Sequence, residues 1–522
     1  MQLFDKDLLS VQEVRGLVSA AKEAQAQLAE QDQAYVDRIV KSIADAGVRN
    51  AARLAVMANE DTGFGIVADK VVKNVFGSYN VWQATKDMKT IGVIDRDEAK
   101  GLATIAVPLG VVAGIIPSTN PTSTTFFKAE IAIKSGNAIV FSPHPAALRC
   151  IQETVKVIRQ AIAEVGGNED LVSVISIPTR QATETLMKHP DTAIILATGG
   201  AAMVHAAYSS GNPALGVGPG NGPAFVDKSA DLPLAVKRIM DSKTFDNGTI
   251  CASEQSIICE EDYKPAVQAE MEKQGAYFLS DEESAKLGKF ILRGNGTMNP
   301  QIVGKSVQTI AGLAGLEVPA GARVLVCKED GVGRGHPYSN EKLAPILGFY
   351  TGKDYKDICD KVCMILNYEG KGHTFSMHTN NQDMVEYFSK RVPVSRICVN
   401  TPSTMGGIGA STALLPSLTL GCGAAGGSAT SENVGPMQLL NLRYVAMGML
   451  EMEDIRATLP DCSSGICVMK PNATAAAPAT APTLGSAPLT SAPAAAPAAN
   501  TAMASADMDA LVAKIVERLQ NA

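Results

Sequence analysis

Clustered positive charge is absent from this sequence of 522 residues. It contains 46 lysines and arginines against 53 aspartates and glutamates, its net charge is −7, and both signs are interspersed. Because binding to nucleic acid needs a concentrated basic surface that neutralises phosphates, nucleic acid is not an expected partner.

Long apolar segments are also missing. The longest uncharged apolar stretch, residues 102–117, is too short for a membrane span and contains Pro and Gly. The start, MQLFDKDLLSVQEV, has no positively charged segment followed by an apolar one, so we predict no secretory signal. We therefore expect a soluble, cytoplasmic protein with no membrane partner.

The ten cysteines lack the paired spacing of zinc ligands. There is no C-x-x-C, and the pair at 359 and 363 has no matching second pair. In a cytoplasmic protein we expect free thiols, most of them small core residues, and we predict no metal site.

What the sequence does contain is a long alternation of predicted helices and strands. Residues 6–60 have apolar residues at helical spacing. The next strands are predicted at 110–117, 137–143, 171–177 and 192–199, with helices between them at 121–136, 145–166 and 179–189. Such alternation indicates an α/β fold with a parallel sheet wound by helices.

Ligands bind parallel sheets at the carboxyl ends of the strands. These ends are residues 117–120, 142–144 and 198–200. We expect these three segments to lie around one binding site.

Four further regions differ in pattern. Residues 89–108 are predicted to form two short strands around a charged turn, a ribbon that needs other surface to pack on. Residues 229–434 repeat the α/β pattern as a second domain. Residues 471–505 hold no charge and no aromatic, and 21 of the 35 are Ala or Pro, which predicts a disordered linker. Residues 506–522 regain an amphipathic helical pattern.

Cys251 stands apart from the other cysteines. It lies in the segment FDNGTICASEQ, behind an Asn-Gly turn and among small and polar neighbours. We expect this segment to be flexible and the thiol accessible, and a nucleophilic thiol also needs a lowered pKa. A buried structural thiol is the alternative.

Two other motifs have competing interpretations. Asn120 precedes Pro121, so its side chain either caps a helix or donates to an oxyanion. The segment GCGAAG (421–426) matches the dinucleotide-binding pattern G-x-G-x-x-G, but no helix is predicted after it. We interpret it as a loop wall that permits close backbone approach.

Several motifs together resemble the aldehyde dehydrogenase superfamily. They are TGG (198–200), NPALGVGPGNGPAFVD (212–227), FDNGTICASEQ, GIIPSTNPTST, SNEKLAPIL, EGKGHTFSMHT and TLGCGAAGGSATSENVGP. Across residues 1–465 the chain resembles most its coenzyme A-acylating branch, which comprises acetaldehyde and propionaldehyde dehydrogenases and the aldehyde half of aldehyde-alcohol dehydrogenases.

The resemblance implies a domain organisation. A Rossmann-type NAD-binding domain would comprise residues 1–88 and 109–228, and residues 229–434 would form the catalytic domain. Residues 89–108, with part of 435–468, would form an oligomerisation ribbon in a homodimer or homotetramer.

The resemblance also implies roles for individual residues. Cys251 would attack a short aldehyde, propionaldehyde or acetaldehyde, and Asn120 with the backbone N–H of Cys251 would hold the oxyanion. Coenzyme A would then take the acyl group. The implied cofactor-binding residues are Pro117, Ser118, Ser142, Pro143, His144, Thr198, Gly199, Gly200, Gly218 and Glu341.

Two of these cofactor assignments leave alternatives open. Many aldehyde dehydrogenases have a lysine where Ser142 stands, so the choice between NAD and NADP stays open. Glu341 is alternatively a surface acid that caps a helix.

The reaction also has alternatives. Hydrolytic members of the superfamily carry a glutamate in the loop equivalent to LGVGPGN, but no Asp or Glu lies between Asp191 and Asp227. This absence favours transfer to coenzyme A over hydrolysis, unless Glu254, which we interpret as an ordinary polar residue, substitutes as the base. We predict His373 and His378 to be satisfied structural histidines. A non-catalytic cargo or scaffold protein is a further alternative.

The C-terminal helix resembles the encapsulation peptides of bacterial microcompartment enzymes. Its apolar face would stay exposed on a monomer, which favours binding to a shell or cargo protein over folding back on its own subunit. The resemblance thus implies a location in a microcompartment lumen.

Overall fold

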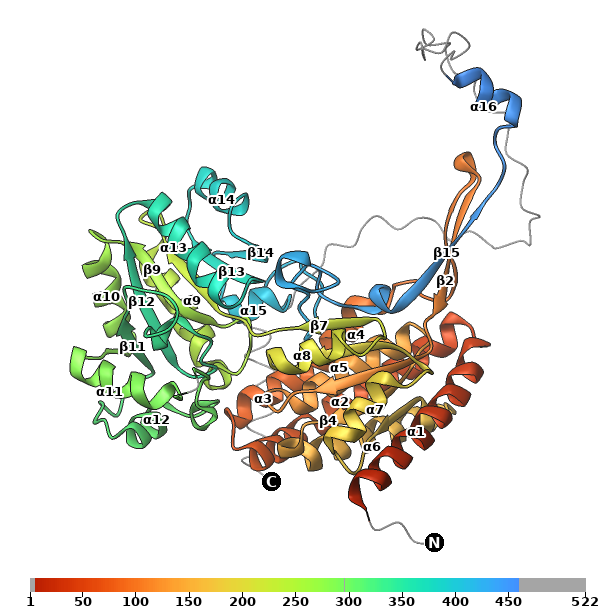
Figure 1. The fold of residues 1–522 in the computed structure, drawn as a ribbon, viewed down its shortest axis with the longest axis horizontal. Helices are drawn as coiled ribbons and strands as arrows, with labels where there is room; N and C mark the ends of the chain where they lie inside the picture. The colour runs from red at the N-terminus through yellow and green to blue at the C-terminus, as the bar shows by residue number, and fades with distance from the viewer. Residues whose placement is uncertain (1–4, 295, 460–522) are drawn as a thin grey trace.

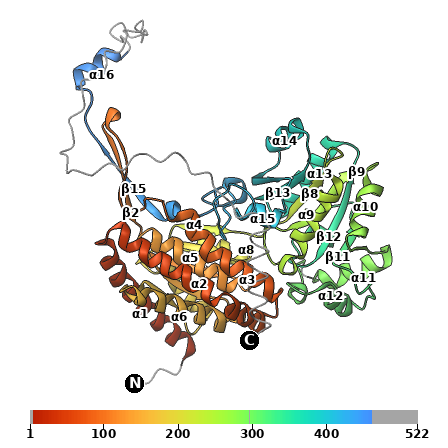
Figure 2. The ribbon, with the colours of Figure 1, turned by 180° about the vertical axis from the view of Figure 1, so that it is seen from behind.

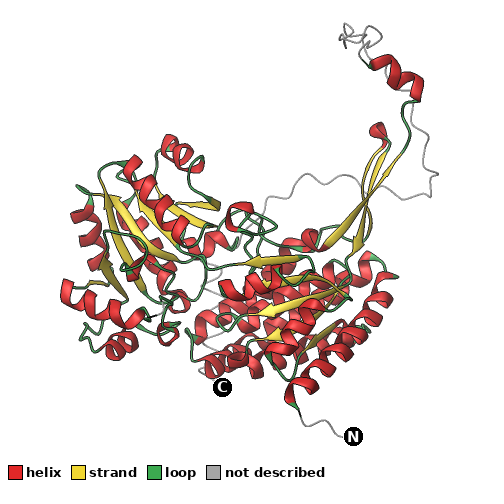
Figure 3. Cartoon of the chain, in the orientation of Figure 1, coloured by secondary structure: helices red, strands yellow, loops and turns green. Residues whose placement is uncertain are grey.

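The computed structural model describes residues 5–294 and 296–459 (Figure 1). Their strands form three sheets of five, seven and three strands. The two larger sheets occupy separate lobes, and the smallest projects away from both as a ribbon (Figure 3). The predicted α/β class is confirmed.

The five-stranded sheet is built from the N-terminal part of the chain. Its strands are β3 (Val111–Ile116), β4 (Ala138–Pro143), β5 (Val172–Val174), β6 (Thr192–Thr198) and β7 (Ala214–Val217). The order is β5-β4-β3-β6-β7 and every pair is parallel, as the alternation predicts. From β3 the chain continues to β4 and β5 on one side of the sheet and then crosses to β6 on the other side of β3. A crevice is expected at such a point, where the carboxyl ends of β3 and β6 lie side by side.

Helices cover both faces of this sheet, because its central strands are buried throughout and need apolar cover on each side. The helices of this lobe are α1 (Lys6–Ala29), α2 (Gln33–Thr62), α3 (Val67–Val75), α4 (Val81–Thr85), α5 (Pro121–Lys134), α6 (Leu148–Glu164), α7 (Arg180–Lys188) and α8 (Ala201–Tyr208). Helices α2, α5 and α6 pack together on one face, and α1, α7 and α8 lie on the other (Figures 1 and 2).

The seven-stranded sheet forms the second lobe and is also entirely parallel. Its strands are β8 (Gly222–Val226), β9 (Glu254–Glu260), β10 (Ala276–Phe278), β11 (Val324–Lys328), β12 (Ile346–Gly352), β13 (Gly372–His378) and β14 (Val394–Val399). The order is β10-β11-β12-β9-β8-β13-β14. Because β8 pairs with β9 and β13, residues 222–226 belong to this sheet, and the expected domain boundary at 228 stays a prediction.

Alternating residues of this sheet pack against helices on opposite faces. Ile257 of β9 packs in the apolar cluster with Val236 and Ile239, whereas the next residue, Ile258, packs in the cluster with Phe375 and Phe388. The helices of this lobe are α9 (Leu232–Thr244), α10 (Lys264–Lys273), α11 (Asp281–Ile291), α12 (Val307–Ala314), α13 (Tyr355–Tyr368), α14 (Gln382–Ser389) and α15 (Ser403–Gly407).

The ribbon consists of β1 (Gly92–Asp97), β2 (Leu102–Pro108) and β15 (Leu440–Ala446), paired antiparallel in the order β1-β2-β15. The predicted pair of strands within 89–108 is confirmed. The ribbon projects from the lobes toward α16 (Met452–Thr458) (Figure 1). Tyr444 on β15 is 63% exposed and Leu450 is 58% exposed, so apolar surface on this part of the chain has no cover.

The predicted linker, 471–505, and the predicted C-terminal helix, 506–522, lie outside the described residues. Among residues 5–294 and 296–459, no helix combines the length and apolar composition that a membrane span requires.

Glu130 on α5 is a buried carboxyl group in the first lobe. Neither of its side-chain oxygens has a hydrogen-bond partner among the described residues. Burial raises its pKa well above the usual range, so the folded state favours the neutral acid.

Glu130→Met is expected to stabilise the protein more at pH 8 than at pH 5. The raised folded-state pKa means that the wild type loses stability as the pH rises above the unfolded-state pKa, and a methionine of similar size removes this loss. We expect a gain of about 1–3 kcal/mol at pH 8 in urea unfolding. Glu23→Met, at an exposed position of α1, is the control. An equal gain at both pH values would contradict this explanation.

Candidate active site

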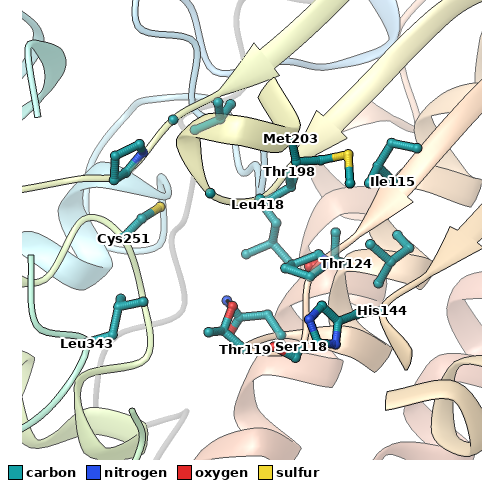
Figure 4. A pocket seen from close by; sticks show the side chains of 18 of the residues that line it. Ile115, Ser118, Thr119, Thr124, His144, Thr198, Met203, Cys251, Leu343 and Leu418 are labelled. Atoms are coloured by element: carbon teal, nitrogen blue, oxygen red, sulfur yellow. Dashed lines mark hydrogen bonds between the residues drawn. The ribbon is translucent and has the colours of Figure 1, made fainter. Parts of the chain in front are cut away.

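A cavity of about 650 Å³ opens at the carboxyl ends of β3, β4 and β6 and extends to the second lobe. Figure 4 shows Cys251 and Leu343 on one side of it, and Ile115, Thr124 and His144 on the other. The predicted meeting of three strand ends at one site is confirmed.

The cavity brings together every residue that the sequence analysis proposed for the site. Its lining includes Pro117, Ser118, Asn120, Ser142, Pro143, His144, Thr198, Gly199, Gly200, Gly218, Cys251 and Glu341. Their positions agree with the expectation, and their individual roles stay predictions.

The turn that carries Cys251 is held in place rather than flexible. It follows α9 as a short helical turn, Phe245–Gly248, in which Asp246 and Asn247 have positive φ angles of 49° and 52°. A Cβ on Gly220 would lie 1.9 Å from the Cys251 carbonyl oxygen. Only glycine allows the two backbones to lie this close, so the expected flexibility of this segment is wrong.

Cys251 has small and polar neighbours along the chain, but in the folded structure its neighbours are apolar. The half-buried thiol packs beside a cluster formed by Phe76, Val217, Ile250, Ala252, Ile408, Leu420 and Cys422. Burial raises the pKa of the Cys251 thiol to about 12, and the charge of Glu341 adds to the increase. The thiol lines the cavity as expected, but its pKa is raised rather than lowered.

Two N–H groups of residues that line the cavity with Cys251 remain available. The backbone N–H of Cys251 donates no hydrogen bond to another residue in the described part of the chain. Asn120 Nδ2 makes a single bond, 3.3 Å, to Thr119 Oγ1, which leaves its second hydrogen free. Together these groups can hold an oxygen anion formed next to Cys251.

Asn120 stands at the N-cap position of α5, directly before Pro121, but its side chain does not cap the helix. Its Oδ1 instead accepts a hydrogen bond of 2.7 Å from Lys73 Nζ of α3. The capping alternative is therefore wrong for the side chain, and its amide can act in the cavity.

Glu341 is the only Asp or Glu among the described residues that line the cavity. Its Oε1 accepts a hydrogen bond of 2.9 Å from the backbone N–H of Gly220, and no helix begins there, so the helix-cap alternative is wrong. Burial, followed by the charge of Glu369, raises the pKa of Glu341 to about 8.

Glu254 is not the ordinary polar residue that we expected. It is fully buried at the start of β9, its Oε1 accepts a 2.9 Å bond from the Ser403 backbone N–H, and burial raises its pKa to about 7. It does not line the cavity, so it cannot activate water beside Cys251.

The two histidines of GHTFSMHT are buried, but they are not satisfied as expected. His373 Nε2 and both ring nitrogens of His378 have no hydrogen-bond partner among the described residues. Burial lowers the pKa of His373 to about 3 and that of His378 to about 4, so both are neutral. Neither lines the cavity.

The part of the cavity at the first sheet fits an extended phosphate-containing cofactor. Gly200 and Gly218 each face open space where a Cβ would stand, and Gly200 caps the N-terminus of α8. Thr198 Oγ1 is buried without a partner among the described residues. Such backbone at a helix N-terminus is suited to bind a pyrophosphate.

Ser142 and His144 complete this part of the cavity. Ser142 Oγ bonds Thr183 Oγ1 at 2.8 Å, and His144 Nδ1 accepts from the Ala146 backbone N–H at 3.2 Å. Burial lowers the pKa of His144, so it adds no fixed positive charge here.

The segment GCGAAG forms no helix beyond a short turn, Ala424–Gly426. A Cβ on Gly421 would lie 2.4 Å from the Thr430 carbonyl oxygen, and one on Gly426 would lie 2.5 Å from that of Lys371. The interpretation of these glycines as a closely packed loop wall is confirmed.

A cluster of potential metal ligands lies outside the cavity: Glu329, Asp330 and His336. Glu329 Oε1 already accepts a 2.6 Å bond from His336 Nδ1 and a 3.2 Å bond from the Asp330 backbone N–H. These bonds within the cluster account for its geometry without a metal ion.

The sequence analysis missed the buried ion cluster whose member Lys73 holds Asn120. Lys70 and Lys73 on α3 both pair with the carboxylate of Asp246, and all three side chains are buried. The only signal in the sequence was the position of Asp246 within FDNG, because the lysines lie about 170 residues earlier.

Comparison with known proteins agrees with this fold. The Aldehyde dehydrogenase family matches residues 5–412, and the chain belongs to this family. The chain is 43% identical over 442 residues to the bifunctional aldehyde-alcohol dehydrogenase AdhE of Escherichia coli K12, covering 84% of this chain and 50% of the relative. The chain thus spans about half the length of the first curated relatives that it matches.

Another curated relative is matched over nearly its whole length. The chain is 38% identical over 433 residues to the succinate-semialdehyde dehydrogenase (acetylating) of Clostridium kluyveri, covering 83% of this chain and 95% of the relative.

Two solved structures are similar in both fold and sequence. One is a probable aldehyde dehydrogenase from Listeria monocytogenes EGD-e, with 60% identity, a TM-score of 0.86, and coverage of 87% of this chain and 100% of the other. The second is an acetylating aldehyde dehydrogenase from Geobacillus thermoglucosidasius, with 49% identity, a TM-score of 0.85, and coverage of 86% and 99%.

More distant structures are propionaldehyde dehydrogenases. The enzyme of the Clostridium phytofermentans fucose utilisation bacterial microcompartment has 28% identity and a TM-score of 0.75, with 83% and 97% coverage. The Rhodopseudomonas palustris enzyme, with bound CoA and an acylated cysteine, has 26% identity and a TM-score of 0.74, with 83% and 97% coverage.

Alkylation of Cys251 by iodoacetamide is expected to be slow at pH 8 and to accelerate about tenfold per pH unit up to pH 10. With a pKa of about 12, roughly one thiol in 10,000 is ionised at pH 8. Glu341→Gln removes a charge that opposes the thiolate, so this variant should react several-fold faster at pH 8. The rate is measured by peptide mass spectrometry, and Cys251→Ser identifies the modified peptide. A plateau below pH 9 would contradict the raised pKa.

Proposed function

We propose that this protein oxidises a short aldehyde, propionaldehyde or acetaldehyde, to its acyl-CoA, with NAD as hydride acceptor and Cys251 as nucleophile. The observation that carries the proposal is that Cys251 and Asn120 line one cavity and that, among the described residues, the Cys251 backbone N–H and one Asn120 amide hydrogen have no partner. NADP is not excluded, because Ser142 and the neutral His144 select neither form of the cofactor.

The reaction begins at the Cys251 sulfur. The thiol loses its proton, the sulfur bonds to the aldehyde carbon, and the carbonyl oxygen becomes an anion held by Asn120 Nδ2–H and the Cys251 backbone N–H. Bound NAD supplies the acceptor for the hydride that leaves this carbon. The carbon–oxygen double bond then re-forms, and the acyl group stays on Cys251 as a thioester.

Coenzyme A completes the reaction as the acyl acceptor. Its thiol loses a proton and attacks the thioester carbon, and Cys251 leaves as the thiolate and is then reprotonated. A thiol ionises far more readily than water, so it needs less help from a general base. Glu341, the single acid among the described residues that line the cavity, accepts a hydrogen bond from the Gly220 backbone N–H, which supports acyl transfer over hydrolysis.

The cofactor roles follow from position in the cavity. Thr198, Gly199, Gly200 and Gly218 would bind the pyrophosphate, and Ser142, Pro143 and His144 would border the adenine ribose. Pro117 and Ser118 would border the nicotinamide, and Glu341 would bind its ribose.

The names of similar proteins support this proposal. The Clostridium kluyveri relative and the Geobacillus structure are both called acetylating, and the Rhodopseudomonas structure contains CoA and an acylated cysteine. For this chain the substrate, the acceptor and the nucleophile remain our proposal.

The decisive assay compares NADH formation from C2 to C4 aldehydes with and without coenzyme A. We expect sustained turnover only when coenzyme A is present, and a loss of at least about 1,000-fold in Cys251→Ser, whose hydroxyl is a much weaker nucleophile. Cys422→Ser, which alters a second thiol of the same cluster, is the matched control and should retain activity. Sustained NADH formation with release of free acid in the absence of coenzyme A would instead favour the hydrolytic alternative.

We also propose that the ribbon joins subunits into a homodimer or homotetramer, with residues 89–108 and part of 435–468 as the interface. Support comes from the antiparallel pairing of β2 with β15 and from the exposed Tyr444 and Leu450. Apolar surface of this kind is covered most simply by another subunit.

Residues 506–522 are proposed to bind microcompartment shell or cargo proteins and so to place the enzyme in the lumen. The amphipathic pattern supports this role, as does the similarity to an enzyme of a fucose utilisation microcompartment. The linker of residues 471–505 would let the helix bind a partner at a distance from the rest of the enzyme.

Removal of residues 506–522 is expected to leave the catalytic rate unchanged and to abolish co-sedimentation with shells. Fusion of the same residues to a fluorescent protein should recruit that protein to shells. Full co-sedimentation of the shortened enzyme would contradict the targeting role. Turnover by a variant ending at residue 470 would exclude the alternative of a non-catalytic cargo or scaffold protein.

A further inference from the structure

We propose that Lys73 is a positioning residue for the reaction, because its ammonium group fixes and polarises the Asn120 amide that donates to the oxyanion. This inference rests on the proposed function, since it assigns a task to Lys73 only if Asn120 acts as that donor.

The bond between the two side chains fixes the orientation of the amide. Lys73 Nζ lies 2.7 Å from Asn120 Oδ1. An ammonium group has three donors and no acceptor, so it can face only the oxygen of the amide and never the NH₂ group. The NH₂ group must then lie on the other side, where Nδ2 has one bond to Thr119 Oγ1 and one free hydrogen.

The charge of Lys73 also strengthens the donor. A hydrogen bond from a cation to the amide oxygen withdraws electron density from the amide, which makes the N–H a better donor to an anion. Lys73 is 4% exposed, so water does not screen this effect. Burial lowers the pKa of Lys73 to about 8, against the opposing charge of Asp246, so the ammonium form prevails at pH 7 and below, where the effect acts.

Lys73 is itself held by the turn that carries the nucleophile. Its Nζ pairs with Asp246 Oδ2 and lies 3.1 Å from Thr249 Oγ1 and 3.3 Å from the Thr249 carbonyl oxygen. Asp246 and Thr249 lie five and two residues before Cys251 in the chain. The same ammonium group therefore sets the position of Asn120 relative to the Cys251 turn.

Lys70 offers a matched comparison within the same cluster. It is 2% exposed and its Nζ lies 3.0 Å from Asp246 Oδ2, but its second contact is the Thr119 carbonyl oxygen at 3.4 Å. It makes no bond to the Asn120 side chain. Loss of Lys70, like loss of Lys73, removes one of the two ion pairs to Asp246, but the Asn120 bond remains.

The test is a double-mutant cycle on the NADH burst that full-length enzyme produces with propionaldehyde and NAD, before coenzyme A is added. Lys73→Met is expected to slow the burst about 10- to 100-fold and Asn120→Ala about 100- to 1,000-fold. The double variant should be no slower than Asn120→Ala alone. Lys70→Met should stay within about threefold of wild type, and NAD affinity by calorimetry should be unchanged in Lys73→Met.

Lys73→Gln keeps a neutral donor and should give an intermediate rate, which supplies the measurement if Lys73→Met does not fold. The inference is overturned if Lys73→Met slows the burst by the same factor in the wild type and in Asn120→Ala. It is also overturned if Lys70→Met slows the burst as much as Lys73→Met does. If Asn120→Ala is slow but Lys73→Met is normal, the inference fails and the proposed function stands. If Asn120→Ala has a normal burst, the oxyanion role of Asn120 fails, and the inference fails with it.

Discussion

The carboxylate of Asp246, buried between the ammonium groups of Lys70 and Lys73, connects the two lobes at the site where chemistry is proposed. Asp246 lies in the turn after α9, and both lysines lie on α3 of the first lobe. Its other oxygen, Oδ1, accepts a 2.7 Å bond from the Ile66 backbone N–H. A buried charge is tolerable only when it is paired and fully hydrogen-bonded, so this cluster permits very few positions of the Cys251 turn relative to Asn120.

The burial that fixes this geometry also decides the chemistry. Apolar packing and the charge of Glu341 raise the pKa of Cys251, so the resting enzyme holds a neutral thiol. A neutral thiol is protected from oxidation and from unwanted electrophiles, since the thiolate is the reactive form. The N–H groups of Cys251 and Asn120 then stabilise the oxygen anion that forms when the sulfur adds to the aldehyde, but they do not stabilise the free thiolate. Few carboxyl groups lie around the sulfur, so little can act as a general base on water.

The sequence predicts features set by residues close together in the chain better than features set by residues far apart in it. The strands and helices of residues 110–199 follow from local periodicity. Ten of the twelve proposed site residues line one cavity because the parallel strands β3, β4, β6 and β7 end at a common edge, whereas Cys251 and Glu341 come from the second lobe. Resemblance to a family supplied the pairing of Cys251 with Asn120, which local pattern alone did not.

The errors have a common physical origin. Cys251 has polar neighbours along the chain but apolar neighbours in space, and the tight approach of Gly220 comes from a separate strand connection. Lys73, the hydrogen-bond partner of the Asn120 side chain, lies on α3, 47 residues earlier. The sequence around Asn120 shows only an Asn before a Pro, which is also the pattern of a helix cap. The buried states of Glu254 and His378 likewise depend on sheet order, which a single sequence does not reveal.

The central claim is that Cys251 carries the acyl group between oxidation and transfer. The most direct test is mass spectrometry of enzyme mixed with propionaldehyde and NAD but no coenzyme A. The account predicts a propionyl adduct on the peptide containing Cys251, which disappears when coenzyme A is added. Full reduction of one equivalent of NAD with no acyl group on that peptide would contradict it.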